Sequence, residues 1–237
     1  MNWPRLIGCF VLSLPAGWFA GVLYERIPGR KKGSAVKLFS PFPTPVFSGV
    51  FFTIHVFTTA LFLIAALRFD DSTIPVLGGY LVFFTSMVAL SAIDLDTLRL
   101  PDRIVGGTLV VGIPIVVVAS IADRESAQIR YALLGALFYF GFLLLTHLAF
   151  PRGMGFGDVK LSALMGLFVG WAAPSGLTAV SLVLYAMLSG FFVGSAVGIV
   201  LFAFRGKSRH YPFGPFLVAG AVLVIIFSQQ LLPDTPL

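Results

Sequence analysis

The chain has 237 residues, of which 58% are hydrophobic and only 11% are charged. This composition excludes an ordinary soluble globular protein, in which about a quarter of the residues are charged. The single cysteine, Cys9, excludes an internal disulfide and a cysteine-based zinc cluster. A formal charge of +6 would suggest a nucleic-acid partner in a soluble protein. Basic loops that orient a membrane protein explain the charge better, and we expect no nucleic-acid partner.

Apolar runs long enough to cross a bilayer recur along the whole chain. They predict an all-α, polytopic membrane helix bundle of about eight transmembrane spans, forming one domain over residues 1–237 within the lipid bilayer. The predicted spans cover residues 6–24, 46–67, 75–93, 104–122, 131–150, 161–174, 177–203 and 213–232. The sixth run is short and rich in glycine, which indicates a tilted or incomplete span. Small residues in "GLFVGWAAPSG" and "LSGFFVGSAVG" predict close approach between helices.

The distribution of basic residues predicts the orientation of the bundle. With the N-terminus outside, most of the 16 basic residues fall in cytoplasmic loops: Arg26, Arg30, Lys31, Lys32, Lys37, Arg99, Arg103, Arg152, Lys160, Arg205, Lys207 and Arg209. The outer segments keep Arg5, Arg68, Arg124 and Arg130. Because basic loops stay on the inner side of a membrane, we expect residues 25–45, 94–103, 151–160 and 204–212 to lie in the cytoplasm.

Two carboxylates lie at the predicted cytoplasmic boundary of the membrane. Asp94 follows the third span in "AIDLDTLRLPDRIV", and Asp158 precedes the sixth in "GMGFGDVK". A carboxylate at such a position is costly to bury and indicates a function. Two carboxyl groups brought together can share a proton, so that one acts as a base toward water and the other as an acid toward a carbonyl oxygen. That is the chemistry of an aspartic protease.

The alternative interpretation is a membrane transporter or a proton or cation relay, since such proteins also use membrane carboxylates and broken, Gly-rich helices. A relay is expected near the midplane of the membrane, together with an internal repeat. Asp94 and Asp158 lie instead at one boundary, and no repeat is evident in the sequence. The pattern therefore favours the protease.

Four segments carry a family resemblance. They are "IDLDTLRLPD", "GMGFGDVKL", "YPFGPFLVAG" at 211–220 and "GWFAGVLYERIP" at 17–28. In this order they resemble the motifs of the type IV prepilin peptidases, membrane aspartic proteases of the GxGD type. The resemblance implies that Asp94 and Asp158 are the catalytic pair. It also implies an enzyme of the bacterial cytoplasmic (inner) membrane, with its active site facing the cytoplasm and no cofactor for proteolysis.

The resemblance further implies the substrates, which are prepilins or pseudopilin-like proteins of type IV pili, protein secretion or competence systems. Such substrates have a short basic leader, a glycine before the cut and an apolar helix after it. The bare backbone of the GxGD region, at Gly153, Gly155 and Gly157, is expected to bind the locally unwound substrate strand. Asp96 and Asp102 are either solvated loop charges or acceptors for the basic leader.

The chain departs from the family pattern near its first cytoplasmic loop. Trp18 and Gly21 stand where the family's first motif usually has Ser and Asn. Many bacterial members carry two CxxC pairs in an enlarged loop there, whereas residues 25–45 are short, basic and free of cysteine. The longer members also methylate the new N-terminus with S-adenosylmethionine, an activity associated with that region. We therefore expect cleavage without N-methylation, or methylation by another protein, and no use of S-adenosylmethionine by this chain.

Three further expectations concern the charged and polar side chains. Lys160 either stabilises the charge of Asp158 or marks the inner interface. His55, His147 and His210 are not spaced as metal ligands, so we expect no metal. Asp158 opens a helix, where unpaired N–H groups favour an anion, whereas Asp94 closes one, where unpaired carbonyls disfavour it. The sequence thus predicts Asp158 as the ionised base and Asp94 as the protonated acid.

Overall fold

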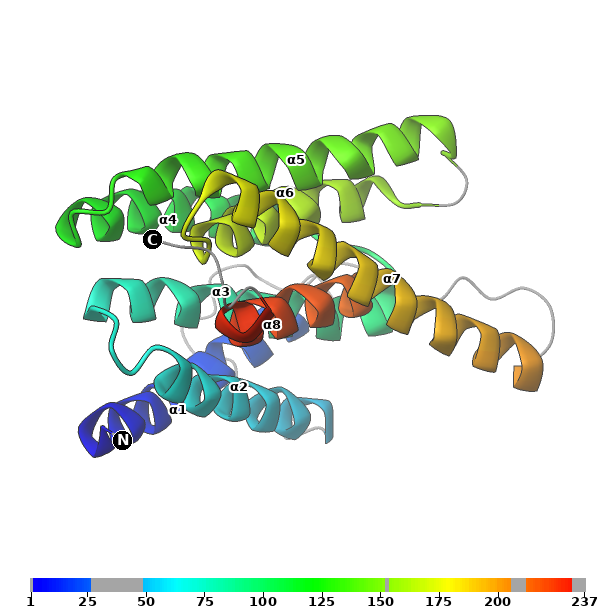
Figure 1. The fold of residues 1–237 in the computed structure, drawn as a ribbon. Helices are drawn as coiled ribbons and strands as arrows, with labels where there is room; N and C mark the ends of the chain where they lie inside the picture. The colour runs from blue at the N-terminus through cyan, green and yellow to red at the C-terminus, as the bar shows by residue number, and fades with distance from the viewer. Residues whose placement is uncertain (1, 27–48, 152–153, 206–211, 232–237) are drawn as a thin grey trace.

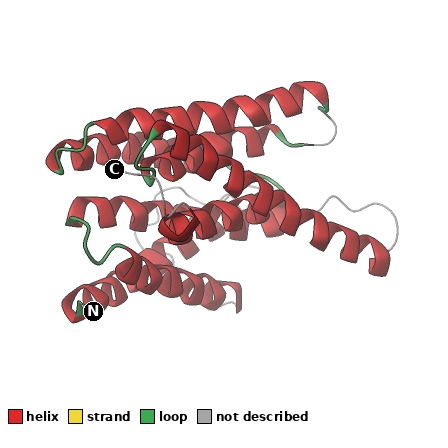
Figure 2. Cartoon of the chain, in the orientation of Figure 1, coloured by secondary structure: helices red, strands yellow, loops and turns green. Residues whose placement is uncertain are grey.

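The computed structural model of the protein describes residues 2–26, 49–151, 154–205 and 212–231, which form helices joined by short connections (Figures 1 and 2). In chain order the helices are α1 (Trp3–Glu25), α2 (Gly49–Arg68), α3 (Ile74–Thr97), α4 (Asp102–Ala122), α5 (Ala127–Ala149), α6 (Phe156–Trp171), α7 (Gly176–Arg205) and α8 (Gly214–Leu231). The described residues contain no strand. The prediction of an all-α bundle is confirmed, while most of the predicted basic loop at 25–45 lies outside the described residues.

Within the described residues, seven helices are long and apolar enough to cross a membrane. The exception is α6, whose 16 residues span about 24 Å, less than the roughly 30 Å of the hydrocarbon core. This helix begins at Phe156 rather than at the predicted 161 and ends at Trp171, shortly before Pro174. It is short because glycines precede it and a proline follows it, and most of its residues are buried by the other helices.

The helices form three groups in Figure 1. The α1–α2 hairpin lies on one side, α3 and α8 lie in the middle, and α4, α5 and α6 lie on the other side. Helix α7 packs against α5, α6 and α8. Consecutive helices run in opposite directions, so the end of α3 and the starts of α4, α6 and α8 meet at one end of the bundle.

Glycines bring the backbones of α5 and α6 into direct contact. A Cβ added to Gly135 on α5 would lie 2.4 Å from the carbonyl oxygen of Gly166, and one added to Gly170 would lie 2.4 Å from that of Tyr131. A similar contact joins α7 to α8, because a Cβ added to Gly190 would lie 3.0 Å from the Phe216 carbonyl oxygen. The predicted role of small residues in close helix approach is confirmed for these pairs.

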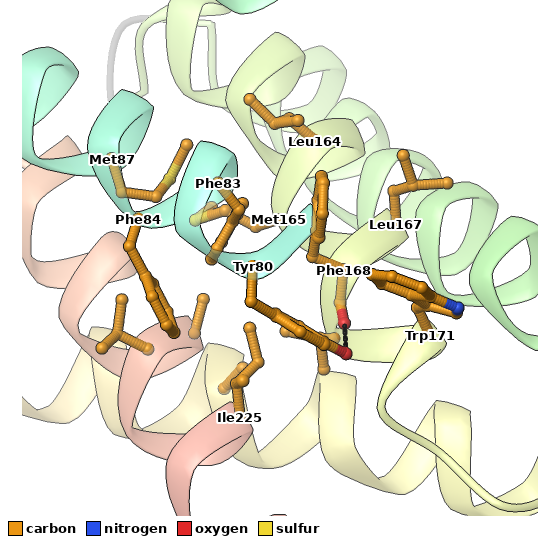
Figure 3. Packing of buried hydrophobic residues seen from close by; sticks show 14 of the residues in the cluster. Tyr80, Phe83, Phe84, Met87, Leu164, Met165, Leu167, Phe168, Trp171 and Ile225 are labelled. Carbon is orange, nitrogen blue, oxygen red and sulfur yellow. Dashed lines mark hydrogen bonds between the residues drawn. The ribbon is translucent and has the colours of Figure 1, made fainter. Parts of the chain in front are cut away.

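Aromatic side chains from α3 and α6 fill the centre of the bundle (Figure 3). Tyr80 stacks on Trp171 with ring centroids 5.0 Å apart and donates a hydrogen bond to the carbonyl of Phe168. Phe83 stacks on Phe168 at 4.6 Å. This packing fixes the position of α6 against α3, and these two helices carry Asp158 and Asp94.

Polar contacts close the opposite end of the bundle. Arg5 on α1 donates to the carbonyl of Phe69, and Arg68 at the end of α2 donates to Ser228 on α8. At the same end of the bundle, the Thr73 hydroxyl donates a hydrogen bond to the carboxylate of Asp123. The N-terminal end of α1 therefore lies at the end of the bundle away from Asp94 and Asp158.

Candidate active site

Asp94 lies one turn before the end of α3 and is buried, with 5% of its surface exposed. The helix ends because Leu98 adopts a left-handed backbone conformation, with φ 54° and ψ 34°, and its N–H donates to the carbonyl of Asp94 at 2.9 Å. A left-handed cap is usually a glycine, and a leucine there is strained. The turn after Asp94 leads directly to Pro101, which caps the start of α4.

Asp158 lies in the first turn of α6 and is also buried, with 9% of its surface exposed. The turn closes with a hydrogen bond of 3.1 Å from the Asp158 N–H to the carbonyl of Gly155. Unpaired N–H groups at a helix start favour a carboxylate, which offsets part of the cost of burying it.

The two carboxylates converge on Gly214, the first residue of α8. The N–H of Gly214 donates a hydrogen bond of 3.1 Å to Oδ2 of Asp94. A Cβ added to Gly214 would lie 2.8 Å from that oxygen and 3.6 Å from Oδ1 of Asp158. Residues 120 positions apart in the chain are thus held together at one helix start, and only glycine leaves room for both carboxylates.

The glycines of the GxGD segment lie in different surroundings. Gly155 is exposed, and a Cβ there would make only ordinary contact with Asp158, at 3.5 Å. Gly157 faces the link between α3 and α4, where a Cβ would approach Leu100 to 3.1 Å. Gly155 therefore leaves open space beside Asp158, whereas Gly157 allows Leu100 of the α3–α4 link to pack closely against the start of α6. Gly153 lies outside the described residues.

The charged residues around the two carboxylates are more exposed. Lys160 forms a salt bridge of 2.7 Å with Asp102 across α6 and α4, with 36% and 68% of their side chains exposed. Its ammonium also lies 5.1 Å from the centre of the Phe156 ring. The sequence left open whether Lys160 stabilises the charge of Asp158. In the structure the Lys160 ammonium pairs with the carboxylate of Asp102 instead. Asp96 is exposed in the last turn of α3, two residues before the link to α4 begins at Leu98.

Two residues that the sequence did not nominate lie on the α5 side of the site. His147 makes a 2.9 Å hydrogen bond to the carbonyl of Met154 and so fixes the segment before Gly155. Tyr139 on the same helix is fully buried, and its hydroxyl has no hydrogen-bond partner among the described residues. Neither residue belongs to a motif, and only their placement on α5 next to α6 identifies them.

The geometry restricts what the site can do chemically. The distances of 2.8 Å and 3.6 Å from the same Cβ position on Gly214 place Oδ2 of Asp94 and Oδ1 of Asp158 at most 6.4 Å apart. Two ionised carboxylates at that distance repel by roughly 2.6 kcal/mol or more at an effective dielectric constant of about 20. A pair that meets in a buried site therefore retains one proton and titrates as a unit. One carboxylate can then accept a proton from water while the other donates one. Among the described residues, no three His, Cys, Asp or Glu side chains gather as metal ligands would.

The chain resembles known proteins over the part that carries both carboxylates. Residues 81–199, half of the chain, match the type IV leader peptidase family. The chain is 34% identical over 146 residues to a prepilin leader peptidase/N-methyltransferase of Burkholderia pseudomallei, an alignment that covers 60% of this chain and 44% of the relative. It is 32% identical over 149 residues to a protein of the same name from Aeromonas hydrophila, covering 61% and 48%. The relative from Dichelobacter nodosus is 30% identical over 186 residues, covering 78% and 60%.

The extent of these similarities is partial for the relatives and clear for the family. The chain spans about half the length of the first of these curated relatives. No solved structure matches it. The family match contains Asp94, Asp158, all of α6 and all but the first seven residues of α3, in a multi-pass helical membrane protein. The chain belongs to the type IV leader peptidase family.

Proposed function

We propose that the protein is a membrane-embedded aspartic endopeptidase that removes the short basic leader of type IV prepilin-like proteins. The observation that carries this proposal is the convergence of the buried carboxylates of Asp94 and Asp158 on Gly214. The two carboxyl groups share one proton, so one activates water and the other protonates the carbonyl oxygen of the scissile bond. Membership of the family does not favour the transporter alternative.

Substrate is proposed to enter as an unwound strand beside Gly155, whose exposed position and missing side chain leave room for another backbone next to Asp158. Gly153 and Gly157 belong to the same proposed segment. Asp96 and Asp102 are proposed to accept the basic leader. Lys160 belongs to the same proposed substrate-binding surface through its salt bridge with Asp102, which forms one exposed edge of the site. The proposal needs no metal and no cofactor for proteolysis, and it treats residues 1–237 as one domain.

The active site is proposed to face the cytoplasm of a bacterium, with the enzyme in the inner membrane and the N-terminus outside. The distribution of basic residues supports this orientation, because 12 of the 16 fall in the segments predicted to be cytoplasmic, 25–45, 94–103, 151–160 and 204–212. A membrane-impermeant thiol reagent tests it, because the only native cysteine, Cys9, is buried. In intact cells the reagent should label Glu125→Cys and leave Arg99→Cys unlabelled. Labelling of Arg99→Cys alone would reverse the orientation.

The proposed activity is tested by co-expression with the prepilin-like proteins of the host and by the mass of the product. Asp94→Asn and Asp158→Asn should each abolish leader removal while leaving expression and membrane insertion intact, because one carboxyl group cannot serve as both acid and base. Asp70→Asn and Asp123→Asn are the matched controls at the opposite end of the bundle and should cleave normally. Normal cleavage by either Asp94→Asn or Asp158→Asn would overturn the protease assignment.

A further inference from the structure

An apolar groove of about 710 Å³ lies beside the candidate active site, between α2, α3 and α8. Each helix contributes residues three or four positions apart, so that one face of each helix lines the groove. Its walls include the exposed side chains of Phe57 on α2, Leu95 on α3 and Leu223 on α8. Smaller residues, Ser91, Ala92 and Ala219, line it between these walls.

One end of the groove lies beside the residues that hold the two carboxylates, although neither carboxylate lines it. Pro215, which lines it, follows Gly214, whose N–H holds Asp94. Leu95 and Asp96 line it directly after Asp94. From this end the lining continues along α8 to Leu223, nine residues with Pro215 included and about 12 Å long.

The dimensions and lining of the groove fit a helix. A stretch of about 12 Å corresponds to roughly two turns of α-helix. In a bilayer, lipid chains are as apolar as leucine, so helices associate through close packing and small residues rather than through the hydrophobic effect. Small residues between larger ones therefore mark a surface on which another helix can pack closely, as Gly135 and Gly166 do between α5 and α6.

We propose that this groove binds the apolar helix of the substrate, over the two turns that follow the scissile bond. The inference rests on the proposed function, because the occupant is the membrane-embedded part of the protein that is cut. A substrate whose leader lies in the cytoplasm and whose helix lies in the bilayer must cross the level of Asp94 and Asp158 between the two. The groove begins at that level and extends into the bundle. It selects substrates by their helix and aligns the cut with the carboxylates.

The first test uses photocrosslinking with the inactive Asp158→Asn enzyme, so that substrate stays intact. Benzoylphenylalanine replaces Phe57 in the groove or, as the matched control, Phe192, which is exposed on α7 and does not line it. The probe substrate has a short basic leader, a glycine and an apolar helix of about 20 residues. We expect a crosslink from position 57 to the first two turns of the probe helix and none from position 192. Adducts only with lipid, only within the enzyme chain, or only with the leader would overturn the proposal.

The second test measures selectivity in the active enzyme. Ala219→Leu fills the groove, and Ala60→Leu places the same side chain on an exposed part of α2 outside it. For Ala219→Leu, kcat/KM for the full probe should fall at least about fivefold relative to kcat/KM for a short peptide that lacks the helix, mainly through KM. Ala60→Leu should leave this ratio unchanged. An unchanged ratio in Ala219→Leu would refute the groove while the protease stands, whereas failure of the wild-type enzyme to cut either probe would refute the proposed function itself.

Discussion

Gly214→Ala should inactivate the site without unfolding the bundle. The added Cβ would lie 2.8 Å from Oδ2 of Asp94, whereas ordinary contacts begin at 3.4 Å. The carboxylate must therefore move by about 0.6 Å, and a misplacement of about 1 Å can cost on the order of 10²-fold in rate. The displaced atom belongs to a short side chain that can rotate, so the backbone need not shift. We expect kcat/KM to fall at least about tenfold while the helical content is retained.

The assay is leader removal from a purified prepilin-like substrate in detergent, followed by mass, alongside thermal unfolding of the enzyme. Gly107→Ala is the matched control, because a Cβ added to that glycine on α4 meets nothing within 4 Å. It should cleave at the wild-type rate and unfold at the same or a slightly higher temperature, since alanine favours helix over glycine by about 1 kcal/mol. Gly214→Ala cleaving at the wild-type rate would show that the contact between Gly214 and Asp94 does not set the active geometry.

Two further predictions concern the product and the helix packing. Product made with this enzyme alone should have the mass of the cleaved chain without a methyl group, because residues 25–45 lack the CxxC pairs of longer family members. A methylated product that depends on S-adenosylmethionine would contradict this prediction. Gly135→Ala should lower the unfolding free energy by about 1–3 kcal/mol, since its Cβ would meet the α6 backbone. Gly141→Ala on the same helix should unfold at the same or a slightly higher temperature than the wild-type enzyme, because its Cβ would meet nothing within 4 Å. Equal unfolding temperatures for the two variants would contradict the packing.

The sequence predicted the helices and the two carboxylates because both leave local signals. Apolar runs reveal the part of each helix that lies in lipid, but a helix continues beyond its apolar run. For this reason α3 reaches Thr97 rather than residue 93, and Asp94 lies within the helix instead of after it. Likewise α6 begins at Phe156, so Asp158 occupies its first turn.

The contacts between distant segments left no such signal. The motif at 211–220 was noticed, yet nothing local indicates that Gly214 donates its N–H to Asp94 across 120 residues. Lys160 is two residues from Asp158 in sequence, but the α-helical turn directs it to Asp102 on α4 instead. His147 and Tyr139 lie beside α6 because α5 packs against it, and this packing depends on backbone contact at glycines. These features follow from the tertiary arrangement, which local patterns do not specify.

The same contacts bear on which carboxylate holds the shared proton. The sequence assigned the negative charge to Asp158, partly because Lys160 could support it. The structure pairs Lys160 with Asp102 and gives Asp94 a hydrogen bond from the first N–H of α8. A hydrogen bond donated to a carboxylate, at the positive end of a helix dipole, favours its ionised form. The contacts thus favour Asp94 as the ionised base and Asp158 as the protonated acid, opposite to the assignment from sequence.

Reagents that distinguish the two forms provide the test. An epoxide reacts with an ionised carboxylate, and a diazo ester reacts with a protonated one. Because the pair titrates as a unit, the labels report its dominant singly protonated state rather than two separate residues. Peptide mapping should find the epoxide on Asp94 and the diazo ester on Asp158, with Asp94→Asn abolishing the epoxide label. In Gly214→Ala, where the N–H to Asp94 contact is disturbed, the preference should weaken. Epoxide on Asp158 in the wild-type enzyme would restore the assignment made from the sequence and show that the α6 helix start outweighs the α8 hydrogen bond.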